Sequence, residues 1–293
     1  MIRLKLILGA FLIFVTVSAF GQARIGINGA VDWEKMEINA VVSLNLASAG
    51  LRMPAGRTQG EALISSEYFR LIRPGILNIQ VDSSSTIADL IERGDWTLSE
   101  AENLVLQART VPPSFSQDFN SLTASYSLGI GGISSALIRH TRPAQVPITL
   151  SPVSAPVYTG IIIIASDSLP VHGRAGTAFP QPCLFPKIWD TDMNLIFERN
   201  MLNPGIDSAA HYFHTQDIFA GGPSGLSPKI TAVAGNRPLR IIARGVFGIV
   251  PTDPIISLDD TLLIISSEEN RKLLSEGRIA IVLAESVLKK EIK

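Results

Sequence analysis

The stretch that decides the fold is YTGIIIIASDSLPVHGR, at residues 158–174. It contains the most apolar run that follows the N-terminal segment, Gly160–Ala165, with four consecutive isoleucines. Four isoleucines are too few to span a membrane, and a short continuous apolar run is typical of a strand that is buried on both faces. We therefore expect the rest of the chain to cover or extend this strand.

A polar loop follows the isoleucine run and contains Asp167, His172 and Arg174. In α/β sheets, sites often lie just past the carboxyl ends of strands. Asp167 and His172 could act as a base and an acid, but Ser166 lacks the G-x-S-x-G motif of a nucleophile elbow. The alternative is a strand-terminating loop whose polar side chains satisfy nearby backbone groups. We predict an interaction surface with Asp167, His172 and Arg174 as binding residues, and we assign no catalytic residue.

The histidines and the single cysteine give no metal-binding pattern. Cys183 has no partner for an intramolecular disulfide, and its apolar neighbours favour a buried thiol that acts as a small hydrophobic group. His211 and His214 would share a face on a helix and could bind zinc there. The surrounding aromatic residues and glycines favour a strand or loop, in which residues three apart point to opposite faces. We predict no metal site and no cofactor.

The segment Asp190-x-Asp192-x-Asn194 resembles the first half of a calcium-binding loop. Such a loop needs glycine at position six and a carboxylate at position twelve, where this chain has Leu195 and Met201. The segment is therefore predicted to be a solvated turn between two strands.

Upstream of the isoleucine run, the pattern predicts strand, helix, strand, helix, helix and strand, at residues 36–46, 57–72, 76–81, 86–93, 98–109 and 122–138. Pro74-Gly75 is expected to end the first helix, and Pro112-Pro113 the third. Glycines 129, 131 and 132 do not fit the G-x-G-x-x-G phosphate-binding motif, and no helix pattern follows them. They predict a bend or bulge in a long strand.

Downstream, the pattern predicts a strand at 239–248, a helix at 258–275 that Ser257 caps, and a strand at 278–283, followed by a charged tail. The helix is long enough for the last strand to pair in parallel with an earlier one. Residues 140–156 hold four prolines and few charges, which is typical of an extended linker.

These patterns predict an α+β fold, with mixed β-sheets and a few flanking helices in two linked subdomains. The expected organisation is a signal peptide, an N-terminal α+β subdomain, a Pro-rich linker and a C-terminal α+β subdomain, at residues 1–23, 24–142, 143–157 and 158–293.

Residues 1–23 have the features of a secretory signal. Arg3 and Lys5 precede an apolar core at Leu6–Val17, and Gly21-Gln22-Ala23 places small residues at the positions that signal peptidase reads, so cleavage is expected after Ala23. An uncleaved N-terminal anchor is the alternative. No cysteine lies near this point, so we expect no lipid anchor. The predicted location is the periplasm or the outer membrane surface.

Composition narrows the range of partners. The chain of 293 residues has 25 Lys and Arg against 26 Asp and Glu, so it lacks the basic excess of nucleic-acid-binding proteins. Charged residues make up 17% of the chain, below the roughly 25% that is typical of soluble domains. A low charge content fits a protein that buries part of its surface in an assembly or lies near a membrane.

From residue 158 to 288 the chain resembles a known group of exported proteins. The similarity lies in YTGIIIIASDSLPVHGR, PCLFPKIWDTDMNLIF, NRPLRIIARGVFG, DPIISLDDTLLII and SEGRIAIVL. These motifs resemble the LPP20-like proteins of Gram-negative bacteria and spirochaetes, which include outer-membrane-associated flagellar and motility accessory proteins. Ala165–Ser168 stands where relatives have Asp-Ala-Arg-Gly. The resemblance implies an exported, non-enzymatic envelope protein.

Three functions are compatible with the sequence. The first is a structural or accessory component of a periplasmic or outer-membrane-associated assembly, with protein partners that include copies of itself; the resemblance implies a flagellar assembly. The second is a binding module for a small ligand or glycan that uses the loops at 167–176 and 211–225. The third is a hydrolase that uses Asp167 and His172. We favour the first and predict no enzymatic activity.

Overall fold

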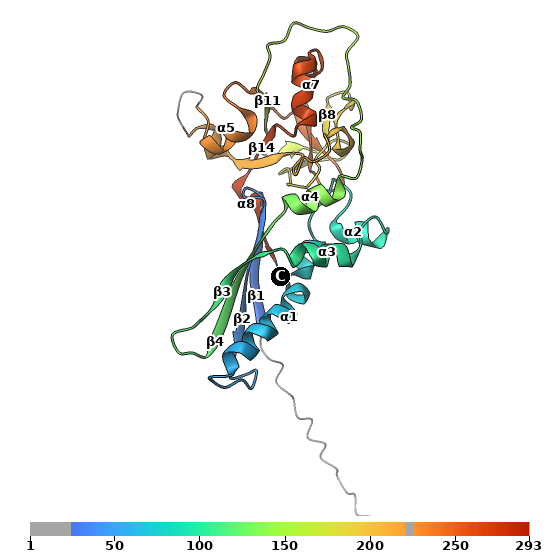
Figure 1. Ribbon diagram of the computed structural model, residues 1–293. Helices are drawn as coiled ribbons and strands as arrows, with labels where there is room; N and C mark the ends of the chain where they lie inside the picture. The colour runs from blue at the N-terminus through green and yellow to red at the C-terminus, as the bar shows by residue number, and fades with distance from the viewer. Residues whose placement is uncertain (1–24, 221–224, 293) are drawn as a thin grey trace, which may run out of the picture.

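The structure is a computed structural model that describes residues 25–220 and 225–292. The predicted signal peptide, residues 1–23, lies outside the described residues. Two units of mixed helix and sheet follow each other along the chain (Figure 1), which confirms the predicted α+β fold with two subdomains. Within the described ranges, no helix has both the length and the apolar character that a membrane crossing requires.

The N-terminal unit is built on an antiparallel sheet in the order β15-β1-β2-β4-β3. The predicted strand at 36–46 is confirmed as β2, in which buried and exposed residues alternate. The bounds of the five strands are Ile25–Asp32 for β1, Glu37–Asn45 for β2, Arg109–Phe115 for β3, Ser121–Gly129 for β4 and Lys289–Ile292 for β15.

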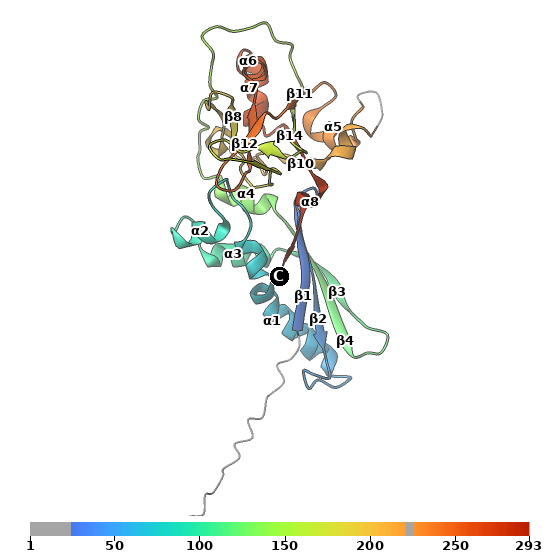
Figure 2. The same cartoon turned by 180° about the vertical axis from the view of Figure 1, so that it is seen from behind.

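One face of this sheet is covered by α1 (Gly56–Leu77), which lies along the sheet in both views (Figures 1 and 2). Ile64 and Ile72 of α1 share one hydrophobic cluster with Ile38 of β2. The predicted helix end at Pro74-Gly75 is wrong, because α1 continues through Pro74 to Leu77. The strand predicted at 76–81 is therefore also wrong, and that segment contributes only an isolated bridge between Gln80 and Thr86.

Two short helices follow, as predicted, and each begins with a capping box. In α2 (Ile87–Glu92) the box joins Thr86 and Asp89, and in α3 (Leu98–Val105) it joins Thr97 and Glu100. The third predicted helix was expected to run to residue 109, but α3 ends at Val105 and Arg109 begins β3. Pro112 and Pro113 are tolerated in β3 because it is an edge strand, which has unpaired backbone groups on one side.

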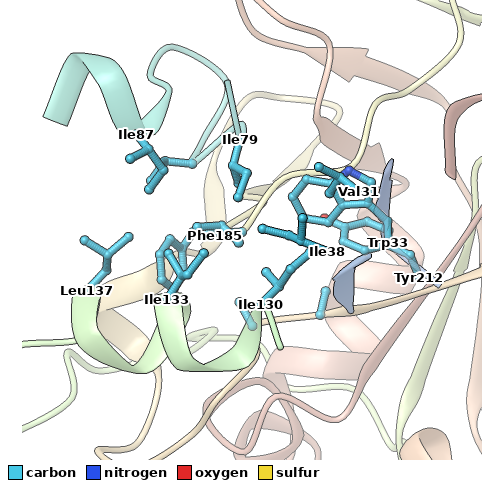
Figure 3. Packing of buried hydrophobic residues seen from close by; sticks show 14 of the residues in the cluster. Val31, Trp33, Ile38, Ile79, Ile87, Ile130, Ile133, Leu137, Phe185 and Tyr212 are labelled. Atoms are coloured by element: carbon cyan, nitrogen blue, oxygen red, sulfur yellow. The ribbon is translucent and has the colours of Figure 1, made fainter. Parts of the chain in front are cut away.

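The long strand predicted at 122–138 is confirmed as far as Gly129 and is wrong beyond it. β4 ends at Gly129, and residues Gly131–Leu137 form the helix α4. Figure 3 shows the reason: Ile130, Ile133 and Leu137 point together towards Phe185, which belongs to the C-terminal unit. Burial against a distant segment therefore determines this helix, and the local glycine pattern does not reveal it.

The C-terminal unit is built on a parallel sheet in the order β10-β14-β5-β11, and its strands are His211–His214, Ile279–Leu283, Ile161–Ile164 and Leu239–Ile242. The isoleucine run forms the inner strand β5, buried on both faces as predicted. Ile161 and Ile163 belong to the main hydrophobic cluster, and Ile162 packs in a second cluster with Ile230 and Ala234 of α5 (Pro228–Ala234). The predicted parallel pairing of the last strand, β14, is confirmed.

A second sheet in this unit has the order β12-β13-β8-β9, with strands Gly245–Phe247, Asp253–Ile256, Ile188–Asp190 and Leu195–Phe197. The single strand predicted at 239–248 is wrong, since β11 and β12 lie in different sheets and are separated by Ala243 and Arg244. The helix predicted at 258–275 is two helices, α6 (Leu258–Ile265) and α7 (Glu268–Ser275), because Ser267 caps the second helix through the N–H of Asn270.

Smaller elements complete the unit. They are β6 (Leu169–Pro170), β7 (Thr177–Ala178), α8 (Glu285–Leu288) and two 3-10 helices, η1 (Arg199–Met201) and η2 (Thr215–Ile218). The segment predicted as a linker, residues 143–157, has neither helix nor strand and arches past α7 (Figure 1). It is held there by the Asn270 side chain, which donates to the carbonyl of Pro156, and by the Ser266 hydroxyl, which accepts from the N–H of Val153.

The two units share one hydrophobic cluster and are joined again at the C-terminus. After β14, the helix α8 and the strand β15 return to the N-terminal unit, where β15 pairs with β1. The predicted charged tail is therefore a strand of the first sheet. Gly75 of α1 makes room for it, since a Cβ at Gly75 would lie 2.7 Å from the side chain of Ile292.

Candidate functional site

The predicted interaction loop is exposed. Asp167 lies between β5 and β6, while His172 and Arg174 lie between β6 and β7. The N–H of His172 donates to the carbonyl of Val246, and a guanidinium nitrogen of Arg174 donates to the carbonyl of Ile249 over 3.1 Å. Within the described residues, no hydrogen bond or ion pair joins Asp167 to His172. The loop is thus fixed to its neighbours by backbone contacts, and its role in binding stays a prediction.

The Asp190 turn uses its carboxylate locally. One oxygen of Asp190 accepts from the N–H groups of Asp192 and Asn194, over 2.9 and 2.8 Å, and the other accepts from the side-chain amide of Asn194 over 2.8 Å. The predicted turn between strands is confirmed, as it joins β8 to β9. Asp190 is buried, so the prediction of a solvated turn is wrong for this residue.

Cys183 is buried, as predicted, and burial raises the pKa of its thiol well above the ordinary value. Its backbone is tied to Tyr212, whose hydroxyl donates to the Cys183 carbonyl over 2.7 Å and accepts from the Cys183 N–H over 3.1 Å. A thiol that stays protonated is a poor nucleophile, so this residue has a structural role.

His211 and His214 lie on β10, in agreement with the predicted strand. His214 comes close to two carboxylates, Glu34 from the β1–β2 turn and Asp217 from η2, so that one ligand atom of each residue lies within 4.8 Å of the others. Asp217 is buried, and its Oδ2 atom has no hydrogen-bond partner within the described residues. Sequence reasoning missed this cluster because Glu34 is far from β10 in the chain.

The geometry of this cluster fits an ion-pair network and not a metal site. Nδ1 of His214 accepts from the N–H of Gln216 over 3.1 Å, so Nε2 carries the ring proton in the neutral side chain. Nε2 is the atom that faces Asp217, at 3.5 Å, and a metal ion would need its lone pair. The ammonium group of Lys229 already forms an ion pair with Glu34.

The outer face of the N-terminal sheet is open. Directly opposed residues share a face of a sheet, and Asn28, Val41, Ser125 and Val111 stand in one such row across four strands. Neighbouring rows add further small, uncharged side chains, namely Ala30, Asn39, Ser43, Thr123 and Ser127. A shallow hollow of about 690 Å³ lies over the middle of the sheet. Its lining includes the central row, parts of the neighbouring rows, and the charged residues Asp32, Lys35, Arg109, Lys289 and Glu291. No described helix covers this face in either view (Figures 1 and 2).

A cleft lies at the junction of the two units. It consists of two adjoining hollows of about 260 and 490 Å³, both lined by Val31, Asn78, Lys289 and Lys290. The smaller hollow is completed by residues of the second unit, Gln181, Pro182 and Val250, and by Trp33. Sequence reasoning missed this cleft because it treated the two lysines as part of a charged tail. Only the return of β15 to the first sheet brings them to it.

Two regions of the chain match families of known proteins. Residues 24–136 match the family described as Treponema pallidum Tp0624, N-terminal domain, and residues 160–285 match the family described as Treponema pallidum Tp0624, second domain. A search of curated proteins found no match. The matches support the spirochaete part of the predicted resemblance and show no link to LPP20-like or flagellar proteins. Over both of its units, in the same order, the chain is thus similar to the domains of a spirochaete protein family.

Proposed function

We propose that this chain is an exported, non-enzymatic envelope protein that serves as a structural or accessory component of a periplasmic or outer-membrane-associated assembly. Its partners are proteins of the envelope, including further copies of itself, and it associates with the outer membrane without a lipid anchor. The signal-like residues 1–23 and the low charge content support this location.

The observation that carries the proposal is the open face of the N-terminal sheet. A sheet in a soluble unit has one face on the core, and its other face is free for water or for a partner. Here the centre of that free face is formed by Asn, Ser, Thr, Ala and Val side chains, while Asp32, Lys35, Arg109, Lys289 and Glu291 also line its hollow. Short side chains lose little rotamer entropy when they are buried, unlike Lys, Glu and Arg. The face therefore suits contact with another protein.

The edge of the sheet favours binding through its face. β3 is an edge strand, and an exposed edge can recruit a strand from another chain. Pro112 and Pro113 lie within β3 and lack N–H groups, so they interrupt the row of donors that an added strand would use. A partner is thus expected to pack on the face around Val41.

Crosslinking and pull-down from the native envelope test the proposal. The wild-type protein is expected to recover partner proteins or a homo-oligomer. Val41→Arg, which places a charge at the centre of the face, should abolish that recovery. Val153→Arg is the matched control, since Val153 is an exposed valine in the linker region and should tolerate the change. Recovery of the wild-type protein alone, as a monomer, would refute the proposal.

The finer identification, a flagellar or LPP20-like accessory protein, rests on the sequence resemblance alone. It predicts that a strain lacking the gene swims poorly and that the wild-type protein restores motility. Alanine at Asp167 or His172 should restore motility equally well, because neither residue has a catalytic role in this proposal. Normal motility of the deletion strain would exclude the flagellar assignment and leave the envelope assignment open to the pull-down.

A second candidate function is a periplasmic binding module for a small ligand. The cleft at the junction of the two units favours it, since ligand sites occur preferentially at domain interfaces. This cleft differs from the loops at 167–176 and 211–225, from which the sequence predicted such a function. The two candidate functions have different central residues, and Lys289 and Glu291 line both the open face and the cleft.

A further inference from the structure

We propose that the cleft between the two units binds a small amphipathic anion, with a carboxylate or phosphate head and an apolar body. The inference is independent of the assembly role, because the cleft does not include the central row of the open sheet face. It rests on the residues that form the walls, on the hydrogen-bond donors that face the cleft, and on its charge.

The walls of the cleft are largely apolar. Side chains from five separate segments meet there, and the smaller hollow is lined by Val31, Ile79, Pro182, Val250 and Val287. Val31 belongs to β1 and Val287 to α8, so the wall spans the point where the C-terminal segment returns to the first sheet. Burial of an apolar body against this wall removes it from water, which favours binding.

Trp33 contributes an indole N–H at the base of the cleft. Its side chain is 3% exposed and packs edge-to-face against Tyr212 at 5.7 Å (Figure 3). Within the described residues, its indole N–H donates no hydrogen bond, although the residue lines the smaller hollow. This N–H is not fully buried, so it can donate to a ligand oxygen in the hollow.

Lys290 provides the charge. It stands opposite Val31 in the β1–β15 ladder, so its side chain lies on the same side of the sheet as Val31 and lines both hollows. No carboxylate forms an ion pair with Lys290 in the part of the chain that the structure describes. Asn78 adds a side-chain amide at the same place. An ammonium group and neutral donors together favour a ligand with several acceptor oxygens.

The neighbouring charges leave Lys290 as the main anion contact. Lys289 faces the opposite side of β15 and stands directly across from Asp32. Glu291 also points to that side, and it lines the larger hollow together with both lysines. The charge of Lys289 is therefore partly balanced by these carboxylates, whereas Lys290 points into the cleft. A neutral ligand would desolvate Lys290 without compensation, which disfavours it.

Calorimetric titration of the purified protein tests the inference with four eight-carbon probes. Octanoate and octyl phosphate should bind and show which head group is preferred, while 1-octanol should bind at least ten-fold more weakly and octyltrimethylammonium not at all. Lys290→Gln should weaken octanoate at least ten-fold, and the wild-type affinity should fall as salt rises. Lys272→Gln, which changes an exposed lysine of α7 far from the cleft residues, should leave the affinity unchanged.

A second measurement uses the indole of Trp33. Octanoate should change the tryptophan fluorescence of the wild-type protein, and Trp33→Phe should remove this change and weaken binding several-fold. Because Trp33 lies in the core, the variant is compared only if its circular dichroism matches the wild type, and Lys290→Gln provides the test otherwise. Equal binding of octanol and octanoate, or an unchanged affinity in Lys290→Gln, would overturn the inference.

Discussion

The two main sheets of this protein bury their strands in different ways. In the N-terminal antiparallel sheet, β2 alternates between buried and exposed residues, and Val41 on the open face is 44% exposed. In the C-terminal parallel sheet, Ile161, Ile162 and Ile163 of β5 are all 0% exposed, because one face packs on the main cluster and the other on α5. Parallel sheets are generally covered on both faces, and antiparallel sheets are often covered on one.

This difference distinguishes a sheet that supports the fold from a sheet that also offers a surface for binding. The inner strand β5 is covered on both faces, although the edge strand β11 exposes Ile242, so a change in β5 acts on stability. The N-terminal sheet has a free face on which a change can act on binding alone. The strand β15 belongs to neither pattern, because it is supplied by the C-terminal segment and completes the first sheet. The cleft that we assign to an anion forms where these two parts meet.

The largest effect is expected from paired glycine substitutions in the two sheets. A Cβ at Gly160, just before β5, would lie 2.4 Å from the Cα atom of Ala234, and backbone cannot easily move away. Gly160→Ala should lower the free energy of unfolding by about 3 kcal/mol. Gly129→Ala, at the end of β4, meets no atom within 4 Å and should be neutral or stabilise slightly.

Urea denaturation of both glycine variants checks this comparison. If both variants lost the same unfolding free energy, the start of β5 would not pack against α5 as closely as it does in the structure.

A smaller effect is expected where β15 joins the first sheet. Gly75→Ala should cost about 1–2 kcal/mol, because its Cβ would overlap the side chain of Ile292, which has some freedom to move. In an Ile292→Ala background the overlap disappears, and Gly75→Ala should become neutral or stabilising through the better helix propensity of alanine. A double-mutant cycle by thermal denaturation measures this coupling. Additive effects of the two changes would contradict the placement of β15.

The elements that the sequence predicts correctly are those whose signals are local. The isoleucine run predicts β5, strict alternation predicts β2, and the capping-box spacing of Thr97 and Glu100 predicts the start of α3. In each case the burial period or the cap lies within a few residues of the element that it specifies.

The elements that the sequence predicts wrongly depend on distant partners. α4 forms because Ile133 and Leu137 pack against Phe185, and β15 forms because β1 offers a free edge. The junction cleft follows the same rule. Trp33, Asn78 and Lys290 are far apart in the chain, and each alone has the features of an ordinary core or surface residue, so no local pattern could identify the cleft.

The pH dependence of stability should reflect one buried carboxyl at the start of β13. Asp253 is fully buried, and burial raises the pKa of its carboxyl above the ordinary value. The folded state therefore holds this proton more tightly than the unfolded state. The group's contribution to the free energy of unfolding falls as pH rises from about 3.9, the unfolded value, through the raised folded value.

Asp253→Asn replaces the carboxyl group with an amide, which does not titrate. Relative to the wild type, the variant should gain stability between pH 4 and pH 7, by about 1 kcal/mol for each unit of pKa difference. Denaturation curves at several pH values measure the difference between the two proteins, in which the other carboxyls cancel. A difference that does not change with pH would show that Asp253 titrates normally in the folded protein.

The smallest effect is expected at the ion pair that links the two units outside their shared core. Lys229 of α5 pairs with Glu34 of the β1–β2 turn, and its side chain is 61% exposed. The hydrogen bond to Glu34 raises the pKa of Lys229, so the pair stabilises the fold below the unfolded lysine value of about 10.4 and loses this effect as pH rises through the folded value.

Exposed pairs contribute only about 0.2–1 kcal/mol, and salt screens them. Lys229→Gln should therefore lower the free energy of unfolding by less than about 1 kcal/mol, and the loss should disappear near 1 M salt. Lys272→Gln changes an equally exposed lysine, whose partner Glu268 in α7 is more exposed than Glu34, and should cost no more. A much larger loss for Lys229→Gln would mean that this contact, and not the shared core, holds the two units together.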